Sequence, residues 1–223
     1  FEIDQSLYQK LTKRFANDSK VEIHNANFLT ALLPKTPFKV FSNIPFNITA
    51  DVVRKLTRPE SNAIDIYLIK QREAAERFIG RPVANETQAS LFFKPWFEGS
   101  VVHEFKRSDF NPSPKVDIVL LRFIRRKKPR VSDPNLFKDF IVFAFNQWKP
   151  TLLDALNAIL TKAQFSGLSK DLSFGLLSRP SELNFDQWLG LYNYFLVGVD
   201  EEKKKLIRGS VDRWSSQQEG LQK

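Results

Sequence analysis

Four consecutive residues carry the clearest chemical signal in this chain. Asn43, Ile44, Pro45 and Phe46 follow directly on an apolar run that begins at Phe38. The side-chain oxygen of the asparagine and a backbone carbonyl of the loop can accept two hydrogen bonds from one amino group. An aromatic ring beside them can stack on a flat base. The pattern therefore indicates the methylation of an exocyclic amine on a nucleobase.

The chemistry of such an amine explains why these residue types are needed. An adenine amino nitrogen is a poor nucleophile because its lone pair is delocalised into the ring. A methylating enzyme must therefore hold both amino protons, and the Ile44 or Pro45 carbonyl can do so together with Asn43. The loss of one aligned polar group of this kind costs about 10²–10³ in rate. The alternative interpretation of the loop is a proline turn with a buried Phe46.

A second aromatic residue stands on a stiff loop further along the chain. Phe110 precedes Pro112 and Pro114, and an apolar run follows from Val116. Base-modifying enzymes hold their target outside its helix by stacking it between aromatic side chains. We expect Phe110 to close the base pocket from the side opposite Asn43. The alternative is a polyproline connector whose aromatic ring fills core space.

Alternating strands and helices must position these residues. Short apolar runs predict strands, and amphipathic stretches predict helices between them. The expected strands are residues 1–3, 20–24, 38–41, 63–69, 100–105 and 117–124. The expected helices are residues 5–17, 49–58 and 72–79, with Thr49 as a cap and Gly80 as a stop. Ligands of open α/β sheets bind beyond the carboxyl ends of the strands, which is where the loop after residue 42 lies.

A charge run with two prolines interrupts this rhythm at residues 125–134. We place a domain boundary there, with an α/β domain over residues 1–130 and a small all-α domain over residues 131–223. The second domain is expected to contain helices at residues 136–145, 152–160, 185–195 and 201–214, each with an aromatic-rich inner face.

The positive charge of the chain is concentrated in the first part. The net charge is +9, and residues 1–131 hold 23 Lys and Arg against 14 Asp and Glu, whereas residues 132–223 hold 11 of each. A basic domain indicates a polyanionic partner, with nucleic acid before an anionic membrane. The residues best placed for RNA phosphates are Arg125, Arg126, Lys127 and Lys128, with Arg72 in the sheet domain. An ordinary charged linker is the alternative for the first four.

Composition excludes several classes of site. The chain has no Cys, which rules out disulfides and thiolate metal sites. His24 and His103 stand alone, without the carboxylate spacing of a metal site, so no metal is expected. No apolar run approaches the roughly 20 residues that cross a bilayer. We expect a cytoplasmic protein without a membrane or metal partner, and a monomer.

Three ordered motifs resemble one known family. Residues 43–49, 71–77 and 110–117 occur in the order and context found in the rRNA adenine N6-dimethyltransferases, which include the Erm resistance enzymes and the KsgA ribosome-biogenesis enzymes. Residues 71–75 and 183–191 resemble the Erm type in particular. The resemblance covers nearly the whole chain.

The resemblance implies a Rossmann-like class I methyltransferase domain that uses S-adenosylmethionine, followed by a helical domain that engages RNA. It implies N6-methylation, mono- or di-, of an adenosine in the peptidyl-transferase region of large-subunit 23S rRNA, which confers macrolide, lincosamide and streptogramin B resistance. The alternatives are a KsgA-type small-subunit enzyme and a catalytically inactive RNA-binding relative. A DNA amino-methyltransferase ranks lower, since its loop usually has two prolines before the aromatic residue.

The same resemblance implies a cofactor-binding set of Glu2, Ile3, Asn27, Phe28 and Asn43. The glutamate would bind the cofactor ribose hydroxyls. An asparagine replaces the family's usual acidic residue at position 27, and its side chain still offers one acceptor oxygen to the cofactor adenine. The Gly-rich turn of the family, expected before Glu2, is not found in the sequence. We therefore expect this chain alone to bind cofactor poorly, and the turn to lie upstream.

Overall fold

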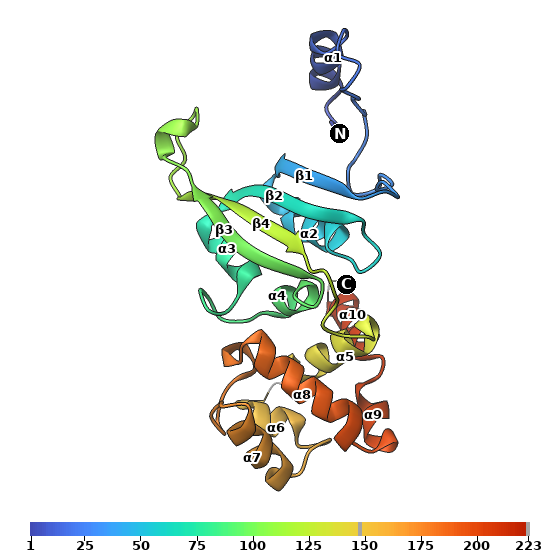
Figure 1. The fold of residues 1–223 in the computed structure, drawn as a ribbon, viewed down its shortest axis with the longest axis vertical. Coiled ribbons are helices and arrows are strands. Elements are labelled where there is room, and N and C mark those ends of the chain that lie inside the picture. The colour runs from blue at the N-terminus through green and yellow to red at the C-terminus, as the bar shows by residue number, and fades with distance from the viewer. Residues whose placement is uncertain (147–148, 222–223) are drawn as a thin grey trace.

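A four-stranded sheet forms the centre of the first part of the molecule (Figure 1). The computed structural model describes residues 1–146 and 149–221, without the side chains of Phe46 and of residues 218–221. The strand order is β1-β2-β4-β3. The strands are β1 (Phe38–Asn43), β2 (Ala63–Gln71), β3 (Phe97–Glu104) and β4 (Ile118–Arg125).

The strand register gathers three strand ends at one edge of the sheet. Strand β1 runs parallel to β2, and its last residue, Asn43, lies opposite Ile69. Strand β4 runs antiparallel to both of its neighbours, β2 and β3, and its residue Leu120 lies opposite Ile69. The carboxyl ends of β1 and β2 therefore meet the beginning of β4 at this edge, and the loop between β3 and β4 projects from the same edge (Figure 1).

Three helices cover one face of this sheet (Figure 1). They are α2 (Thr49–Leu56), α3 (Arg72–Ile79) and α4 (Gln88–Phe93). Between them and the sheet lies an apolar core that contains Leu56, Ile66, Leu121 and Phe123, all fully buried. On β1 the burial alternates from residue to residue, and Phe41 is 69% exposed. The core therefore lies on one side of this edge strand, as the period of a strand requires.

The N-terminal segment stands away from the sheet (Figure 1). Its helix α1 (Gln5–Arg14) begins after Asp4, whose carboxylate accepts the Leu7 N–H. The predicted strand at residues 20–24 is wrong, because extended pairing there is limited to one parallel bridge between Glu2 and Asn25. The Lys55 ammonium of α2 donates to the carbonyl of Phe28 at 2.7 Å and so ties this segment to the sheet domain.

After β4, the regular elements of the described residues are all helices. They are α5 (Pro134–Phe145), α6 (Leu152–Leu156), α7 (Lys162–Asp171), α8 (Phe185–Gly198), α9 (Glu201–Ile207) and α10 (Ser210–Leu221). Their core is aromatic, with Phe140 packed against Trp188, Tyr192 and Phe195. The predicted single helix over residues 201–214 is wrong, because Gly209 adopts a φ of +76° and separates α9 from α10.

The predicted fold class is confirmed, with a mixed α/β sheet first and helices after it. The predicted boundary between residues 130 and 131 falls in the linker from β4 to α5. Gly80 ends α3 as predicted, with a φ of +67°. Thr49 does not cap α2, since Ile48 is the cap residue and the Thr49 hydroxyl donates to the Pro45 carbonyl instead.

In the described part of the chain no helix has the length and apolar character needed to cross a membrane.

Candidate functional site

Asn43 and Phe110 line one small cavity at the edge where the strand ends meet. The cavity has a volume of about 120 Å³, and the other residues that line it are Ile69, Lys70, Pro112, Pro114 and Ile118. Pockets for drug-sized ligands measure about 300–1,000 Å³. A space of this size suits a single flat group rather than a whole nucleotide.

The loop after β1 turns sharply into a short 3₁₀ helix, η1 (Phe46–Ile48), and then into α2. Asn43 is exposed, whereas Ile44 is buried against the core. The Pro45 carbonyl accepts the Thr49 hydroxyl at 3.2 Å and the Ile48 N–H at 3.4 Å, so it faces the start of the helix. The predicted stacking role of Phe46 concerns a side chain outside the described part of the structure.

The loop between β3 and β4 holds Phe110 over the cavity. The Phe110 ring packs edge-on against Phe105, with 5.5 Å between their centroids, and Phe105 packs in the same way against His103. The base of the loop is closed by an ion pair at 3.1 Å between Arg107 and Asp117. The histidine is thus one member of an aromatic row that supports Phe110.

Arg72, predicted as an RNA contact, lies at the base of this same loop. Its guanidinium pairs with the Glu104 carboxylate at 2.6 Å, and its backbone N–H donates to the Asp117 carbonyl at 2.9 Å. These two contacts join the start of α3 to the beginning and the end of the β3–β4 loop. In this structure Arg72 therefore positions the loop that carries Phe110.

Lys70 is a residue of this site that the sequence reasoning missed. It is only 1% exposed, and its ammonium donates to the Ile44 carbonyl at 2.9 Å. Burial lowers the pKa of Lys70 to about 8. The available signal was a lysine directly after the apolar run at residues 66–69, since Lys is almost never fully buried unless it is paired.

Four of the five residues predicted to hold the cofactor lie on the N-terminal segment, and the fifth, Asn43, ends β1. Glu2 and Asn25 form the parallel bridge, which places Glu2 beside the segment that contains Asn27. One Glu2 carboxylate oxygen accepts the Asp4 N–H at 2.8 Å, and the Asn27 side-chain oxygen accepts the Leu29 N–H at 2.9 Å. Ile3 is exposed. Phe28 is half-buried, and its ring packs edge-on against the ring of Phe1.

The chemistry of this donor set fits the nucleoside end of S-adenosylmethionine. A carboxylate has a second oxygen for ribose hydroxyls, and an amide oxygen has a second lone pair for an adenine amino group. Residues 1–79 contain no glycine, so the Gly-rich turn that the family resemblance implies is not among them.

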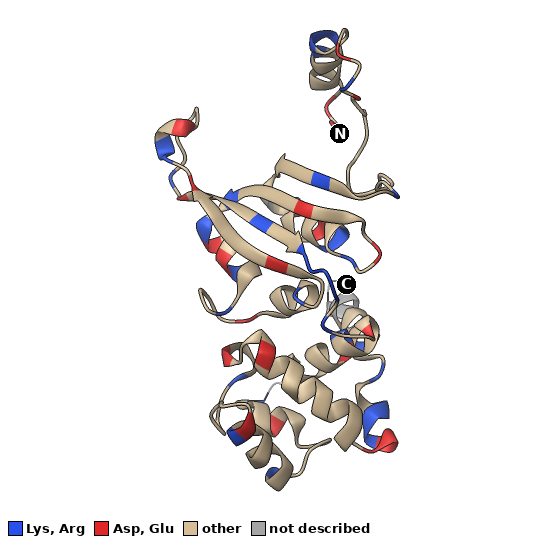
Figure 2. Cartoon of the chain, viewed as in Figure 1, with Lys and Arg blue, Asp and Glu red and all other residues tan. Residues whose placement is uncertain are grey.

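The basic linker lies at the opposite end of the sheet from the cavity. Strand β4 begins at Ile118, which lines the cavity, and ends seven residues later at Arg125, which is roughly 24 Å away at the rise of an extended strand. Figure 2 shows the cationic stretch between the sheet and the helices. The antiparallel direction of β4 causes this separation, because it carries the chain back across the sheet.

Two of the four predicted linker cations are engaged within the protein. The Arg125 guanidinium donates to the carbonyls of Ala63 and Ser61. The Arg126 side chain is 19% exposed, pairs with Glu98 at 2.6 Å and donates to the Lys94 carbonyl. Lys127 and Lys128 are exposed. The charge that this linker presents to solvent is therefore chiefly that of the two lysines.

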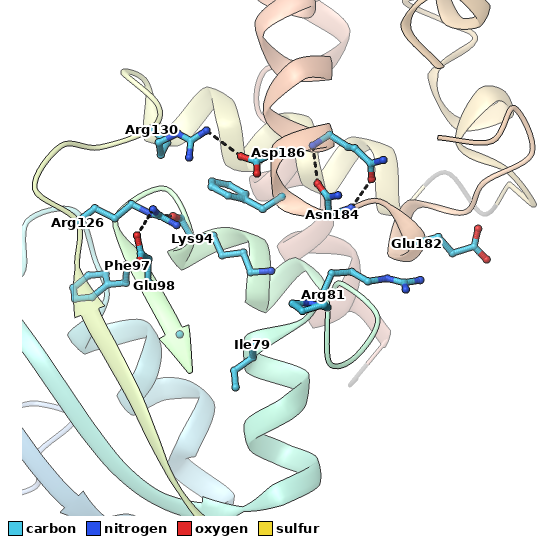
Figure 3. A pocket seen from close by; sticks show the side chains of 14 residues that line it. Ile79, Arg81, Lys94, Phe97, Glu98, Arg126, Arg130, Glu182, Asn184 and Asp186 are labelled. Carbon is cyan, nitrogen blue, oxygen red and sulfur yellow. Dashed lines mark hydrogen bonds and ion pairs between the residues drawn. The ribbon is translucent and has the colours of Figure 1, made fainter. Parts of the chain in front are cut away.

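A larger cavity of about 790 Å³ lies at the junction of the sheet and the helices (Figure 3). Arg126 and Arg130 each lie 5.9 Å from the Phe185 ring at the start of α8, and Arg130 pairs with Asp186 at 3.0 Å. Arg126 and Arg130 thus make contacts that join the linker after the sheet to helix α8. Within the described residues, no group of His, Asp and Glu side chains could bind a metal.

Comparison with known proteins places this arrangement in one family. The sequence pattern of ribosomal RNA adenine dimethylases matches residues 1–196. An rRNA adenine N-6-methyltransferase of Bacillus licheniformis is 29% identical over 195 residues, which cover 86% of this chain and 67% of the relative. A ribosomal RNA small subunit methyltransferase A of Nostoc punctiforme is 28% identical over 218 residues, which cover 90% and 76%.

Solved structures share the fold. The crystal structure of the 23S rRNA methyltransferase ErmE has a TM-score of 0.78 at 24% identity and covers 87% of this chain and 80% of its own. A dimethyladenosine transferase from Plasmodium falciparum has a TM-score of 0.65 at 19% identity and covers 88% and 81%. Together with the family match, these likenesses establish that the chain belongs to the ribosomal RNA adenine dimethylases, S-adenosylmethionine-dependent enzymes that methylate adenines of rRNA.

Proposed function

We propose that this protein methylates N6 of one adenosine in the peptidyl-transferase region of 23S rRNA and so confers resistance to macrolides, lincosamides and streptogramin B. The observation that supports this site most directly is the shared cavity of Asn43 and Phe110 at the carboxyl ends of β1 and β2. The sequence likeness of residues 71–75 and 183–191 to the Erm type favours the large-subunit substrate.

Asn43 and the loop backbone would hold the target amine. The side-chain oxygen of Asn43 accepts one hydrogen bond from the amino group, and the Ile44 carbonyl accepts the other, so that the nitrogen becomes more tetrahedral and its lone pair is less delocalised into the ring. Phe110 stacks on one face of the base, as aromatic residues do with bases taken out of a helix. S-adenosylmethionine, when bound, supplies the methyl group. One amino proton then leaves to water.

The cofactor's nucleoside end would be held by the N-terminal segment. We assign Glu2 to the ribose hydroxyls and Asn27 to the adenine amino group, with Ile3 and Phe28 as apolar neighbours. Asn43 would serve both ligands, since it lies at the strand end where amine and methyl group must meet. The replacement of an acidic residue at position 27 lowers the charge that faces the cofactor adenine.

The rRNA phosphates would be bound mainly by Lys127 and Lys128. Both are exposed, whereas Arg125, Arg126 and Arg72 are engaged in intramolecular contacts. The lysines lie far from the acceptor cavity, so they would contact a part of the rRNA away from the target adenosine. They would raise affinity without specifying the base.

A small-subunit rRNA is the second candidate substrate. It is supported by the Nostoc punctiforme relative, whose similarity extends over 90% of this chain. Dimethylation of adenosines during ribosome assembly uses the same acceptor chemistry, so the cavity itself does not separate the two substrates.

Methyl transfer to each purified rRNA tests this proposal. The full-length protein, labelled cofactor and either protein-free large-subunit or protein-free small-subunit rRNA are incubated, and the modified nucleosides are identified by mass spectrometry. We expect N6-methylated adenosine in the large-subunit rRNA. Label in the small-subunit rRNA alone would show that small-subunit rRNA is the substrate. No label in either rRNA would refute the methyltransferase activity.

A further inference from the structure

The ammonium of Lys70 bridges the protein core and the acceptor loop. The side chain is 1% exposed, its nitrogen donates to the Ile44 carbonyl at 2.9 Å, and it lines the cavity shared by Asn43 and Phe110. The carbonyl that it holds belongs to the residue directly after Asn43. A buried cation thus touches the backbone that must meet the target amine.

The two carbonyls of the loop face different directions. The Pro45 carbonyl accepts two donors at the start of α2, the Thr49 hydroxyl and the Ile48 N–H. A carbonyl oxygen has two lone pairs, and these two contacts use both. The Ile44 carbonyl accepts the ammonium of Lys70, a residue that lines the cavity, and the oxygen has a second lone pair for a further donor. Sequence alone left the choice between these two carbonyls open.

The position of Lys70 in β2 calls for a functional reason. Side chains alternate along a strand, and Ile66 and Leu68 precede it on the core face, both fully buried. Burial of an ammonium is costly unless the group is hydrogen-bonded, and here the bond is made to the backbone of the acceptor loop. The lysine therefore links the end of this buried row to Ile44.

We propose that Lys70 is a positioning residue for methyl transfer, which fixes the Ile44 carbonyl so that this oxygen accepts the second amino proton of the target adenine. This inference rests on the proposed function. It separates two tasks within the site. Asn43 touches the substrate through its side chain, and Lys70 acts through the backbone of the next residue.

Kinetic constants of the Lys70→Met protein test this role, because methionine fills the volume without the cation. We expect kcat to fall about 10- to 100-fold, less than the 10²–10³ for a group that contacts the reacting atoms. The KM values for rRNA and cofactor should stay within about twofold, since in the proposed role Lys70 acts through the Ile44 carbonyl. Thermal unfolding of both proteins controls for folding. An unchanged kcat would overturn the inference.

Chemical rescue distinguishes positioning from a merely structural role. The chain has no Cys, so a Lys70→Cys protein carries a single thiol. Alkylation of the unfolded protein with 2-bromoethylamine, followed by refolding, restores an ammonium at the same reach, whereas iodoacetamide used in the same way adds a neutral group of similar size. We expect kcat to recover at least tenfold with the amine and not with the amide. Equal recovery with both reagents, or recovery with neither, would overturn the inference.

The wild-type protein separates this inference from the proposed function. Methyl transfer by the wild-type protein to neither rRNA would refute the proposed function, and the inference with it. An active wild-type protein beside a fully active Lys70→Met protein would refute the inference alone.

Discussion

The side chains of Asn43 and Phe110 line the same cavity although they belong to opposite halves of the sheet domain's sequence. Asn43 ends β1, and Phe110 lies in the loop between β3 and β4. Strand β2 brings them together, because its end lies beside Asn43 and its register with β4 sets the base of the loop. The methyl-acceptor site thus depends on the strand order β1-β2-β4-β3 as much as on the residues themselves.

Replacement of Phe110 should separate stacking from simple filling of space. Stacking of a base on an aromatic ring contributes about 1–3 kcal/mol. We expect Phe110→Leu to lower kcat/KM for rRNA roughly 10- to 100-fold and Phe110→Tyr to retain most of it. Steady-state methyl transfer measures both. Equal activity of the Leu and wild-type proteins would show that the ring does not contact the base.

Lys70 should make the stability of the protein rise with pH. Its pKa in the folded protein is about 8, below the usual 10.5, so the unfolded chain binds more protons between these two values. The free energy of unfolding therefore increases from about pH 8 to pH 10.5, by on the order of 3 kcal/mol from this group.

Urea unfolding of the wild-type and Lys70→Met proteins at pH 7 and pH 10 isolates this contribution. The other lysines titrate equally in both proteins and cancel in the difference. We expect the wild-type protein to gain stability relative to Lys70→Met between the two pH values. A constant difference would mean that the Lys70 pKa is not lowered.

Gly80→Ala should destabilise the protein strongly. Gly80 has a φ of +67° and a ψ of −147°, which is a backbone region almost restricted to glycine. An added Cβ would lie 2.3 Å from Glu86 Oε2, and Glu86 is buried in an ion pair with Lys94. We expect a loss of about 3 kcal/mol or more in the free energy of unfolding.

A matched glycine controls this experiment. Gly167 lies in the exposed part of α7, and an added Cβ would meet no atom within 4 Å. Gly167→Ala should therefore stabilise the protein by about 0.5–1 kcal/mol. Denaturant unfolding compares the two variants, and similar effects at both positions would contradict the account of Gly80.

Substitution of both linker lysines should weaken rRNA binding in a salt-dependent way. Each phosphate contact adds about 0.7–0.9 to the slope of log affinity against log salt. The double variant Lys127→Ala, Lys128→Ala should therefore lower this slope by about 1.5, as measured by filter binding at several salt concentrations. The control is Lys162→Ala, Lys170→Ala on α7, which removes the same charge. Equal slopes in both variants would exclude the linker as the binding surface.

Periodicity predicted most of the sheet and the longer helices, because their buried faces repeat at regular spacing. Short elements escaped it: α4 (Gln88–Phe93) has only six residues, and α7 has a weak apolar face. The break at Gly209 depends on a positive φ that a spacing pattern does not reveal. The strand predicted at residues 20–24 lacks a neighbour to pair with beyond the one bridge.

The acceptor site was predictable in part. Asn43 and Phe110 were identified because their residue types match the chemistry of a base. The contact of Lys70 with Ile44 was not, because it joins a strand interior to a loop 26 residues earlier. Arg125 and Arg126 were predicted to contact RNA, but the structure shows them in intramolecular contacts. A charge run in the sequence does not indicate which of its side chains pair within the protein.

Methyl transfer by the Asn43→Ala protein to protein-free large-subunit rRNA tests the central claim most directly. Asn43 is exposed, so its replacement should leave thermal unfolding unchanged. Asn47→Ala, an exposed asparagine in the same loop, is the matched control. We predict a loss of about 10²–10³ in kcat for Asn43→Ala and wild-type activity for Asn47→Ala. Wild-type activity of a folded Asn43→Ala protein would contradict the assignment of this loop as the methyl-acceptor site.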